Sequence, residues 1–274
     1  MQPKVCVIIS TYNRGDLIGK AVESILAQNY KNLEIIIVDD GSTDNTDDVL
    51  SKYGNKIKVL KEKKVGRVKA RDIGIEHSDA KYISILDSDD YFADKSKIKD
   101  QVEFLEKHDD HVLVGGGIIK IDRNGREIMK FMPLENDRDL RERMLLNNMF
   151  SHSTVLYRSE AFEKIGGYCG FNNSEYVGYL EDWNMWLRLG KIGKMHNLQK
   201  YLSYYLEAGQ NLSDVNVRED LGMGLHLRIK FRKDYPNFFK ALAIGTIQYA
   251  NSLMPFRKKN SEFLKKIRKT VFKY

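Results

Sequence analysis

The first ninety residues alternate between short apolar runs and longer segments with helical spacing. The apolar runs are rich in β-branched residues, which is typical of strands buried on both faces, and they predict strands at 4–9, 33–38, 57–60 and 82–86. Segments 17–26, 42–53 and 65–77 are predicted helices, with Asp16 capping the first and Ser42 or Thr43 the second. Repeated strand–helix units of this length predict an α/β fold with a doubly wound, mostly parallel sheet and helices on both faces.

The pattern after residue 94 is less regular. Helices are predicted at 95–107, 138–148, 160–165 and 182–189, and extended segments at 112–121 and 154–157. Asn124 and Gly125 mark a turn, and Gly115–Gly117 indicate close packing or a bulge. The chain has four prolines and no low-complexity linker, so residues 1–215 are predicted to form one domain.

Three polar clusters directly follow predicted strands: STYNR at 10–14, DDGSTD at 39–44 and DSDD at 87–90. In parallel α/β sheets, ligands bind outside the carboxyl ends of the strands. The clusters are therefore expected to converge on one edge of the sheet.

The DSDD segment places three carboxylates within four residues. It is either a solvated acidic turn or a site where one or two carboxylates hold Mg²⁺ or Mn²⁺ together with substrate phosphates. An EF-hand is excluded because Phe92 stands at the position of the loop glycine. The loop of an acyl-phosphate phosphatase also begins D-x-D. Two residues after that motif it has a hydroxyl residue, and here Tyr91 stands at this position, which weakens the phosphatase interpretation.

The other polar segments have two interpretations each. DDGSTD has the residues of a turn and a helix cap. Its alternative interpretation is a ligand site, in which the helix N-terminus binds an anion and a carboxylate accepts a hydrogen bond from an imide or a ribose. Arg67, Lys69 and Arg71 form either a solvated helix face or a cationic site for a diphosphate. The sequence has no GxGxxG motif or complete P-loop, so neither a nicotinamide enzyme nor a P-loop NTPase is expected.

Composition and charge narrow the function classes. Apolar residues make up 42% of the chain, and two cysteines exclude a disulfide framework or a four-cysteine zinc site. The net charge of +7 is uneven, because residues 226–274 hold 13 Lys and Arg against 2 Asp and Glu. The remainder holds 36 acidic and 32 basic residues, which argues against nucleic-acid binding by the body and predicts an anionic partner for the tail.

Five motifs in one order carry a resemblance to a known family. The segments ISTYNR, IIIVDDGSTDNT, KARDIGI, YISILDSDD and GGYCGFNNSEYVGYLEDWNMWLRL resemble the family 2 glycosyltransferases of the GT-A fold, over residues 4–213. Each motif is weak alone, but the order and spacing are specific. The resemblance implies a GT-A domain at 1–215, with a nucleotide-binding half at 1–93 and an acceptor-binding half at 94–215, followed by a helical extension at 216–274.

The resemblance also implies roles for the donor side of the site. Thr11 and Asn13 would lie against the nucleotide, and Asp40 would accept the uracil imide N–H. Arg71 would lie near the base or the diphosphate, although Asp72 follows it where related sequences have Asn. In the D-x-D motif, the ribose would face Asp87, and Asp89 would hold Mn²⁺ or Mg²⁺ against the phosphates of the donor.

On the acceptor side, the Glu-Asp pair of the family matches Glu181 and Asp182, and Asp182 is the expected catalytic base. Without the other motifs, a helix N-cap ahead of residues 183–189 would be the preferred interpretation of Asp182. The candidates for the acceptor or sugar pocket are Glu181, Trp183 and His152, and Trp183 also has the spacing of a core residue. Related chains often end the domain with Y-R-x-H, whereas residues 205–208 here are Tyr-Leu-Glu-Ala.

The resulting hypothesis is a metal-dependent, inverting glycosyltransferase that moves a sugar from a nucleotide donor, expected to be UDP-linked, to a glycan or lipid-linked glycan. The alternatives are a phosphatase or nucleotidyltransferase that uses DSDD, and a non-catalytic sugar-nucleotide binder.

The basic tail, 216–274, is expected to lie on an anionic membrane surface as an amphipathic helix; packing on the body and nucleic-acid binding are its other interpretations. The N-terminus lacks a secretion signal and no long apolar stretch occurs, so the expected location is the cytoplasm, at the inner face of the membrane.

Overall fold

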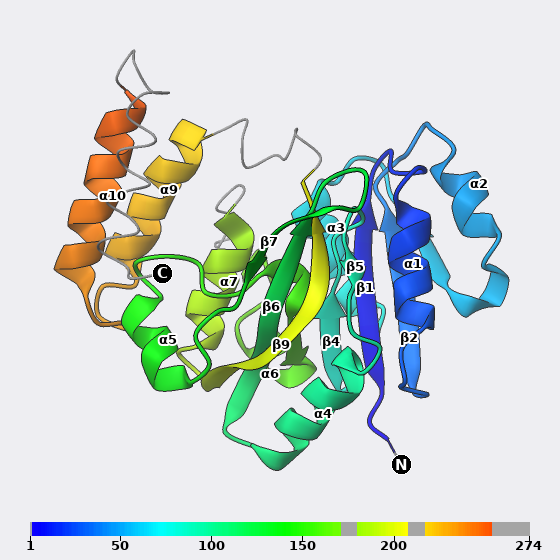
Figure 1. Ribbon diagram of the computed structural model, residues 1–274, viewed down its shortest axis with the longest axis horizontal. Coiled ribbons are helices and arrows are strands. Elements are labelled where there is room, and N and C mark those ends of the chain that lie inside the picture. Colours follow the sequence, from blue (N-terminus) through cyan, green and yellow to red (C-terminus); the bar gives the residue numbers. More distant parts are fainter. Residues whose placement is uncertain (1, 171–179, 208–216, 254–274) are drawn as a thin grey trace.

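A curled nine-stranded sheet, in the order β3-β2-β1-β4-β8-β6-β9-β5 with β7 paired to β6, forms the centre of the molecule (Figure 1). The structure is a computed structural model, and it describes residues 2–170, 180–207 and 217–253. Its first half contains the parallel strands β1 (Val5–Thr11), β2 (Leu33–Asp39), β3 (Lys58–Lys61) and β4 (Tyr82–Ile85). They are connected through the helices α1 (Ile18–Leu26), α2 (Thr46–Ser51) and α3 (Arg67–Glu76), with a 3₁₀ turn at Gly54–Lys56. The predicted α/β architecture is confirmed.

The second half of the sheet is mixed. It comprises β5 (Tyr91–Phe92), β6 (His111–Ile121), β7 (Glu127–Phe131), β8 (Leu156–Arg158) and β9 (Lys194–Leu206). β8 runs antiparallel to both β4 and β6, whereas β9 runs parallel to β6. The helices of this half are α4 (Lys97–Lys107), α5 (Asp137–Arg143), α6 (Ser159–Lys164) and α7 (Glu181–Leu189), and a 3₁₀ turn spans His152–Thr154.

The core consists of two large apolar clusters, and β1 contributes to both. Val5, Val7 and Ile9 belong to one cluster, while Cys6 and Ile8 belong to the other, and all five are fully buried. Successive side chains of a strand point to opposite faces, so this alternation shows that apolar layers cover both sides of the sheet. The position of the sheet, and therefore of its strand ends, is fixed by this two-sided burial.

Strand β9 is the main element that the hydrophobic pattern does not predict. Its thirteen residues include Asn197, Gln199 and Lys200, which interrupt the apolar alternation. Its register with β6 shifts at Gly116/Gly117, and a Cβ on Gly116 would lie 2.5 Å from the Leu202 side chain. The glycines thus permit close approach of the two strands, as their sequence indicates.

Several predicted helix starts and ends differ in the structure. The helix expected at 138–148 ends at Arg143, and its remainder forms a loop into the site. Asp16 does not cap α1, since Leu17 occupies the N-cap and no side chain accepts a hydrogen bond there. Neither Ser42 nor Thr43 caps α2. Instead, the side chain of Asp44 accepts hydrogen bonds from the backbone N–H and the hydroxyl of Thr46, at 3.0 and 2.5 Å.

Two antiparallel helices, α9 (Val217–Lys230) and α10 (Phe238–Ser252), lie side by side at the end of the molecule opposite α1 and α2 (Figure 1). Leu227, Phe231 and Tyr235 join the larger core cluster, and the Tyr235 hydroxyl donates to the Leu187 carbonyl at 2.8 Å. This part of the basic tail therefore packs on the body. The amphipathic segment expected beyond residue 257 lies outside the described residues. No helix within residues 2–170, 180–207 and 217–253 is long and apolar enough to cross a membrane.

Candidate active site

The loops after β1 and β2 are tied together by hydrogen bonds. The backbone N–H of Asn13 donates to Ser42 Oγ at 2.9 Å, and Asn13 Oδ1 accepts the backbone N–H of Thr43 at 2.8 Å. Asn13 has a positive φ of 51°, a conformation that Asn tolerates better than most residues. Thr11, at the end of β1, is buried. Two of the predicted nucleotide-binding segments thus form one continuous edge at the carboxyl ends of the strands.

Asp40 connects the end of β2 to the start of α3. Its carboxylate accepts the backbone N–H groups of Val65 and Gly66, at 2.6 and 2.9 Å. Gly66 has a φ of +87°, which a residue with a Cβ rarely adopts. A carboxylate has about four acceptor positions, so these bonds fix the orientation of Asp40 while leaving positions for a further donor. They also fix the direction of α3, which carries Arg67 and Arg71.

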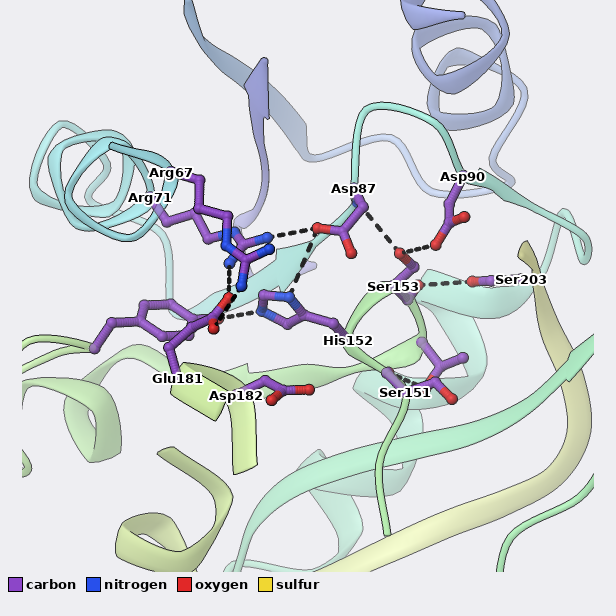
Figure 2. Close-up of polar contacts among 12 residues, drawn as sticks. Arg67, Arg71, Asp87, Asp90, Ser151, His152, Ser153, Glu181, Asp182 and Ser203 are labelled. Atoms are coloured by element: carbon purple, nitrogen blue, oxygen red, sulfur yellow. Dashed lines mark hydrogen bonds and ion pairs between the residues drawn. The ribbon is translucent and has the colours of Figure 1, made fainter. Parts of the chain in front are cut away.

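Arg71 joins the two acidic segments of the site. Its guanidinium donates to Asp87 at 2.6 Å and to Glu181 at 2.8 Å, and Arg67 donates to the other oxygen of Glu181 at 2.8 Å (Figure 2). Burial would lower the pKa of Arg71, but the charges of Asp87 and Glu181 raise it overall, so it stays protonated. Residues from α3, the β4 loop and α7 are therefore held in one buried ion-pair network.

The three carboxyls of DSDD have different environments. Burial opposes ionisation of Asp87, but the charges of Arg71 and Arg67 lower its pKa overall. Asp90 is buried and accepts the Ser153 hydroxyl at 2.6 Å and the Leu206 backbone N–H at 3.1 Å. Burial, then the charges of Asp87 and Asp89, raise its pKa well above the ordinary value. Asp90 thus fastens this loop to the 3₁₀ turn and to the end of β9.

Asp89 lines a different cavity from Asp87 and Asp90. Burial and the neighbouring charge of Asp87 raise its pKa, and it lines a cavity of about 250 Å³ together with Asp16 and Tyr91. Within the described residues, no group of three or more His, Cys, Asp and Glu side chains is arranged to hold a metal ion. One or two carboxylates suffice for Mg²⁺ or Mn²⁺ when substrate phosphates complete the shell, so Asp89 fits a cation of that kind.

Asp182 lies at the first turn of α7, next to Glu181. Its carboxylate accepts the Asn148 side-chain amide at 2.7 Å and the backbone N–H of Trp183 at 2.6 Å. Burial, followed by the charge of Glu181, raises the pKa of Asp182 to about 7. Asp182 and Asp87 line the same cavity, which has a volume of about 300 Å³. A carboxyl with this pKa, facing a cavity, is suited to accept a proton at neutral pH.

His152 lies between these two carboxyls (Figure 2). Its Nε2 is 2.5 Å from the Tyr168 hydroxyl, and its Nδ1 is 3.6 Å from Asp87. Burial and the charge of Arg71 lower its pKa to about 3, so the imidazole is neutral at neutral pH. Asp72 accepts the backbone N–H groups of Tyr168 and Cys169, at 3.0 and 3.2 Å. The residue that replaces the family's usual Asn therefore anchors the loop that places Tyr168 against His152.

The Trp183 side chain is 5% exposed and belongs to the core cluster. Its indole N–H donates to the Met144 carbonyl at 2.8 Å, and the Arg228 guanidinium lies 5.0 Å from the ring centroid. In the structure, Trp183 therefore packs α7 against the core. At the end of β9, the buried Leu206 stands at the position of the Arg of Y-R-x-H, and the next residue, Glu207, forms an ion pair with Lys120 at 2.7 Å.

Three residues in the site have no signal in the sequence. Asn148 lies in a loop and Ser153 in the 3₁₀ turn, and they contact Asp182 and Asp90 only because segments that are far apart in sequence meet. Tyr168 follows Gly166 and Gly167, whose φ values of 75° and 72° turn the chain back to the site. The glycine pair indicates a turn in the sequence, but no pattern in the sequence indicates that Tyr168 contacts His152.

The fold and the arrangement of the site are those of a glycosyltransferase of the GT-A type. The family model described as "Glycosyl transferase family 2" matches residues 6–166. The chain is 30% identical over 270 residues to "Uncharacterized glycosyltransferase RP339" of Rickettsia prowazekii, covering 94% of this chain and 81% of that protein. It is 32% identical over 206 residues to the "Putative glycosyltransferase EpsE" of Bacillus subtilis, covering 73% and 72% of the two chains. This chain belongs to glycosyltransferase family 2.

Solved structures agree with the fold. TarS of S. aureus in complex with UDP-GlcNAc superimposes with a TM-score of 0.65 at 22% identity, covering 94% of this chain and 74% of TarS. The mannosyltransferase PcManGT of Pyrobaculum calidifontis, solved with GDP-Man and Mn²⁺, gives a TM-score of 0.63 at 18% identity, covering 98% and 76%. The GT-A fold inferred from the motifs is confirmed.

Proposed function

We propose that this family 2 glycosyltransferase is a metal-dependent, inverting enzyme that transfers a sugar from a UDP-linked donor to a hydroxyl of a glycan or lipid-linked glycan. The observation that carries the proposal is the shared cavity of Asp87 and Asp182, which are 95 positions apart in sequence. The UDP-GlcNAc complex of TarS and the GDP-Man and Mn²⁺ complex of PcManGT support a nucleotide-sugar donor and a divalent cation.

The donor's nucleotide would lie along the edge formed by Thr11, Asn13 and Asp40, with the uracil imide donating to Asp40. Arg71 orients Asp87 toward the ribose through its ion pair at 2.6 Å. Asp89 would hold Mn²⁺ or Mg²⁺, and the bound cation would stabilise the negative charge that develops on the departing UDP. Arg67 adds positive charge at the same side of the site, since its side chain is 32% exposed beside Glu181.

Asp182 would act as the base in a single displacement. The acceptor oxygen forms a bond to the anomeric carbon while the bond from that carbon to the phosphate oxygen breaks, and its electron pair leaves with UDP. The acceptor proton moves to the Asp182 carboxylate, which Asn148 orients through a hydrogen bond of 2.7 Å. Attack opposite the leaving group inverts the anomeric configuration.

A donor screen tests the proposal. Thermal shifts with UDP, GDP and their sugar conjugates, each with and without Mn²⁺, should show the largest cation-dependent stabilisation for a UDP-sugar. Turnover with a glycan acceptor should then release UDP. Release of inorganic phosphate instead would favour the phosphatase alternative, and donor binding without any turnover would favour the non-catalytic binder.

The charge of Glu181 should set the pH dependence of the reaction. In Glu181→Gln, one of the two main causes of the raised pKa of Asp182 is removed, and Arg67 and Arg71 are partly released. The acidic limb of the turnover profile should therefore move to lower pH, by about one unit. The measurement is turnover from pH 5 to 9 for wild type, Glu181→Gln and the exposed control Glu76→Gln. An acidic limb that does not move would contradict the role of Asp182 as base.

The tail is proposed to bind anionic membrane surfaces. Residues 257–274 contain eight Lys and Arg and one Glu. They follow α10 in sequence, and this helix exposes Phe239 and Ile247 to 83% and 55%. A chain lacking residues 257–274 should bind anionic liposomes at least roughly 10²-fold more weakly, because each basic residue near such a surface contributes about 1 kcal/mol. Donor hydrolysis should be unchanged. Equal liposome binding by the two chains in a co-sedimentation assay would refute this part of the proposal.

A further inference from the structure

The side chain of Arg228 extends from α9 to α7 and to the loop that follows α5. Its guanidinium lies 5.0 Å from the centroid of the Trp183 ring, and its Nη2 donates to the carbonyl of Leu146 at 3.2 Å. Figure 1 shows α9 between α10 and α7, so this side chain joins the helical extension to the helix that carries Asp182. Arg228 is buried, and it lies beyond residues 6–166, which match the family model.

Two glycines leave the space that the guanidinium occupies. A Cβ on Gly224, one turn earlier in α9, would lie 2.9 Å from Arg228 Nη1, and a Cβ on Gly245 of α10 would lie 3.3 Å from Arg228 Cζ. Glycine in the interior of a helix is destabilising relative to alanine. The extension therefore carries two unfavourable helix residues at the positions that leave room for Arg228 beside the Trp183 ring.

The loop that Arg228 contacts carries Asn148, whose side-chain amide donates to the Asp182 carboxylate at 2.7 Å. Two carbonyls of this loop accept hydrogen bonds from outside it. The Trp183 indole N–H donates to the Met144 carbonyl at 2.8 Å, and Arg228 donates to the carbonyl two residues further on. Trp183 directly follows Asp182 in α7. The contacts that place both ends of the Asn148–Asp182 hydrogen bond thus converge on Arg228.

We propose that Arg228 is a positioning residue for sugar transfer: it holds the Asn148 loop against α7 and so keeps the Asn148 amide on the carboxylate of Asp182. The inference rests on the proposed function, because it assumes that Asp182 is the catalytic base. It makes the helical extension part of the catalytic unit, since α9 supplies the side chain that links the loop to α7. Donor binding should not depend on this link, because other elements form the nucleotide edge at the ends of β1 and β2.

Arg228→Met removes the hydrogen-bond donor and the charge but keeps a long side chain beside Trp183. Its kcat should fall roughly tenfold, the size expected when one orienting hydrogen bond is lost, while its affinity for UDP with Mn²⁺ stays within about twofold of wild type. The acidic limb of its turnover profile should move to higher pH, because the Asn148 hydrogen bond lowers the pKa of Asp182. A purely structural role would lower activity without moving this limb.

The assay is steady-state UDP release from pH 5 to 9, with the UDP-sugar and the methyl glycoside that give the highest wild-type turnover in a screen. Calorimetry of UDP with Mn²⁺ on the same samples gives the donor affinity. Arg218→Met is the matched control, since Arg218 is exposed on the same helix, and it should behave as wild type. Arg228→Lys, which restores the charge and a donor without the planar guanidinium, should recover part of the lost kcat.

A double-mutant cycle tests whether Arg228 acts through Asn148. In the Asn148→Ala background, Arg228→Met should change kcat by less than about twofold, because the hydrogen bond that Arg228 supports is already absent. If Arg228→Met does not fold, Gly245→Ala takes its place in the cycle and in the pH profile. Its Cβ would press on the guanidinium from α10, while alanine favours the helix.

An additive cycle, or an acidic limb that stays in place, would overturn the inference, as would an equal loss of kcat in Arg228→Met and Arg218→Met. Asp182→Asn in the same assay reports separately on the proposed function. If Asp182→Asn loses transfer while Arg228→Met behaves as wild type, the positioning role is wrong. If Asp182→Asn turns over normally, the assignment of the base is wrong.

Discussion

Asp182→Asn should reduce sugar transfer by roughly 10²–10⁴-fold while leaving donor binding intact. The side chain keeps its shape, but an amide cannot accept the acceptor's proton at neutral pH. Wild-type turnover should rise with pH through about 7, where the Asp182 carboxyl loses its proton, and the residual activity of the variant should lack this limb. Steady-state UDP release across pH, together with UDP calorimetry in Mn²⁺, measures both quantities.

Stability separates a catalytic effect from a folding defect in this variant. Asp182 has a folded pKa of about 7, above its ordinary value of 3.8, so its contribution to stability declines as pH rises from about 4 to 7. A neutral Asn avoids the free-energy cost of a buried ionised carboxylate, so the Tm of Asp182→Asn at pH 7.5 should equal or exceed that of wild type. The exposed Asp139→Asn on α5 serves as control. Normal turnover by a well-folded Asp182→Asn would place the base elsewhere.

Asp89→Ala should lower the affinity for UDP in the presence of Mn²⁺ by roughly 10²-fold or more, because the cation's interaction with the phosphates is worth several kcal/mol. Binding of UDP in the absence of divalent ions should change little, since the edge formed by Thr11, Asn13 and Asp40 is untouched. Calorimetric titrations with Mn²⁺ and with EDTA give the two affinities.

Asp16 provides a specific control for Asp89, because it is a second carboxylate at the same cavity. Asp16 lines the cavity beside Asp89 but comes from the loop before α1. Asp16→Asn removes a similar charge, yet it should leave the Mn²⁺-dependent affinity for UDP within about twofold of wild type, as is usual for an exposed substitution. If Asp89→Ala and Asp16→Asn behave alike, the effect reflects general electrostatics and not coordination by Asp89.

The regular part of the fold could be predicted because its signals are local. Strands β1, β2 and β4 are continuous β-branched runs, and they were predicted to within three residues at either end. β9 was missed because polar residues interrupt it and its pairing with β6 is shifted at the glycines. Its burial depends on a strand some 80 positions earlier, which no local pattern reveals.

The same distinction applies to the site. Motif order alone led to Asp40, Asp87, Asp89 and Asp182, since each follows a recognisable strand or precedes a helix. Motif order did not predict that the three carboxyls of DSDD have different environments. Asp90 is a structural anchor for the end of β9, and Asp87 forms an ion pair with Arg71, whereas burial and the charge of Asp87 raise the pKa of Asp89. These differences arise from neighbours that are far away in the chain.

The sequence by itself determined the α/β architecture, the family and the carboxylates at the strand ends, because apolar periodicity and ordered motifs are written in consecutive residues. Only the tertiary structure decided the chemical state of those groups. The raised pKa of Asp182 and the neutral state of His152 depend on burial and on charges from separate segments. Burial and through-space electrostatics exist only once the chain is folded.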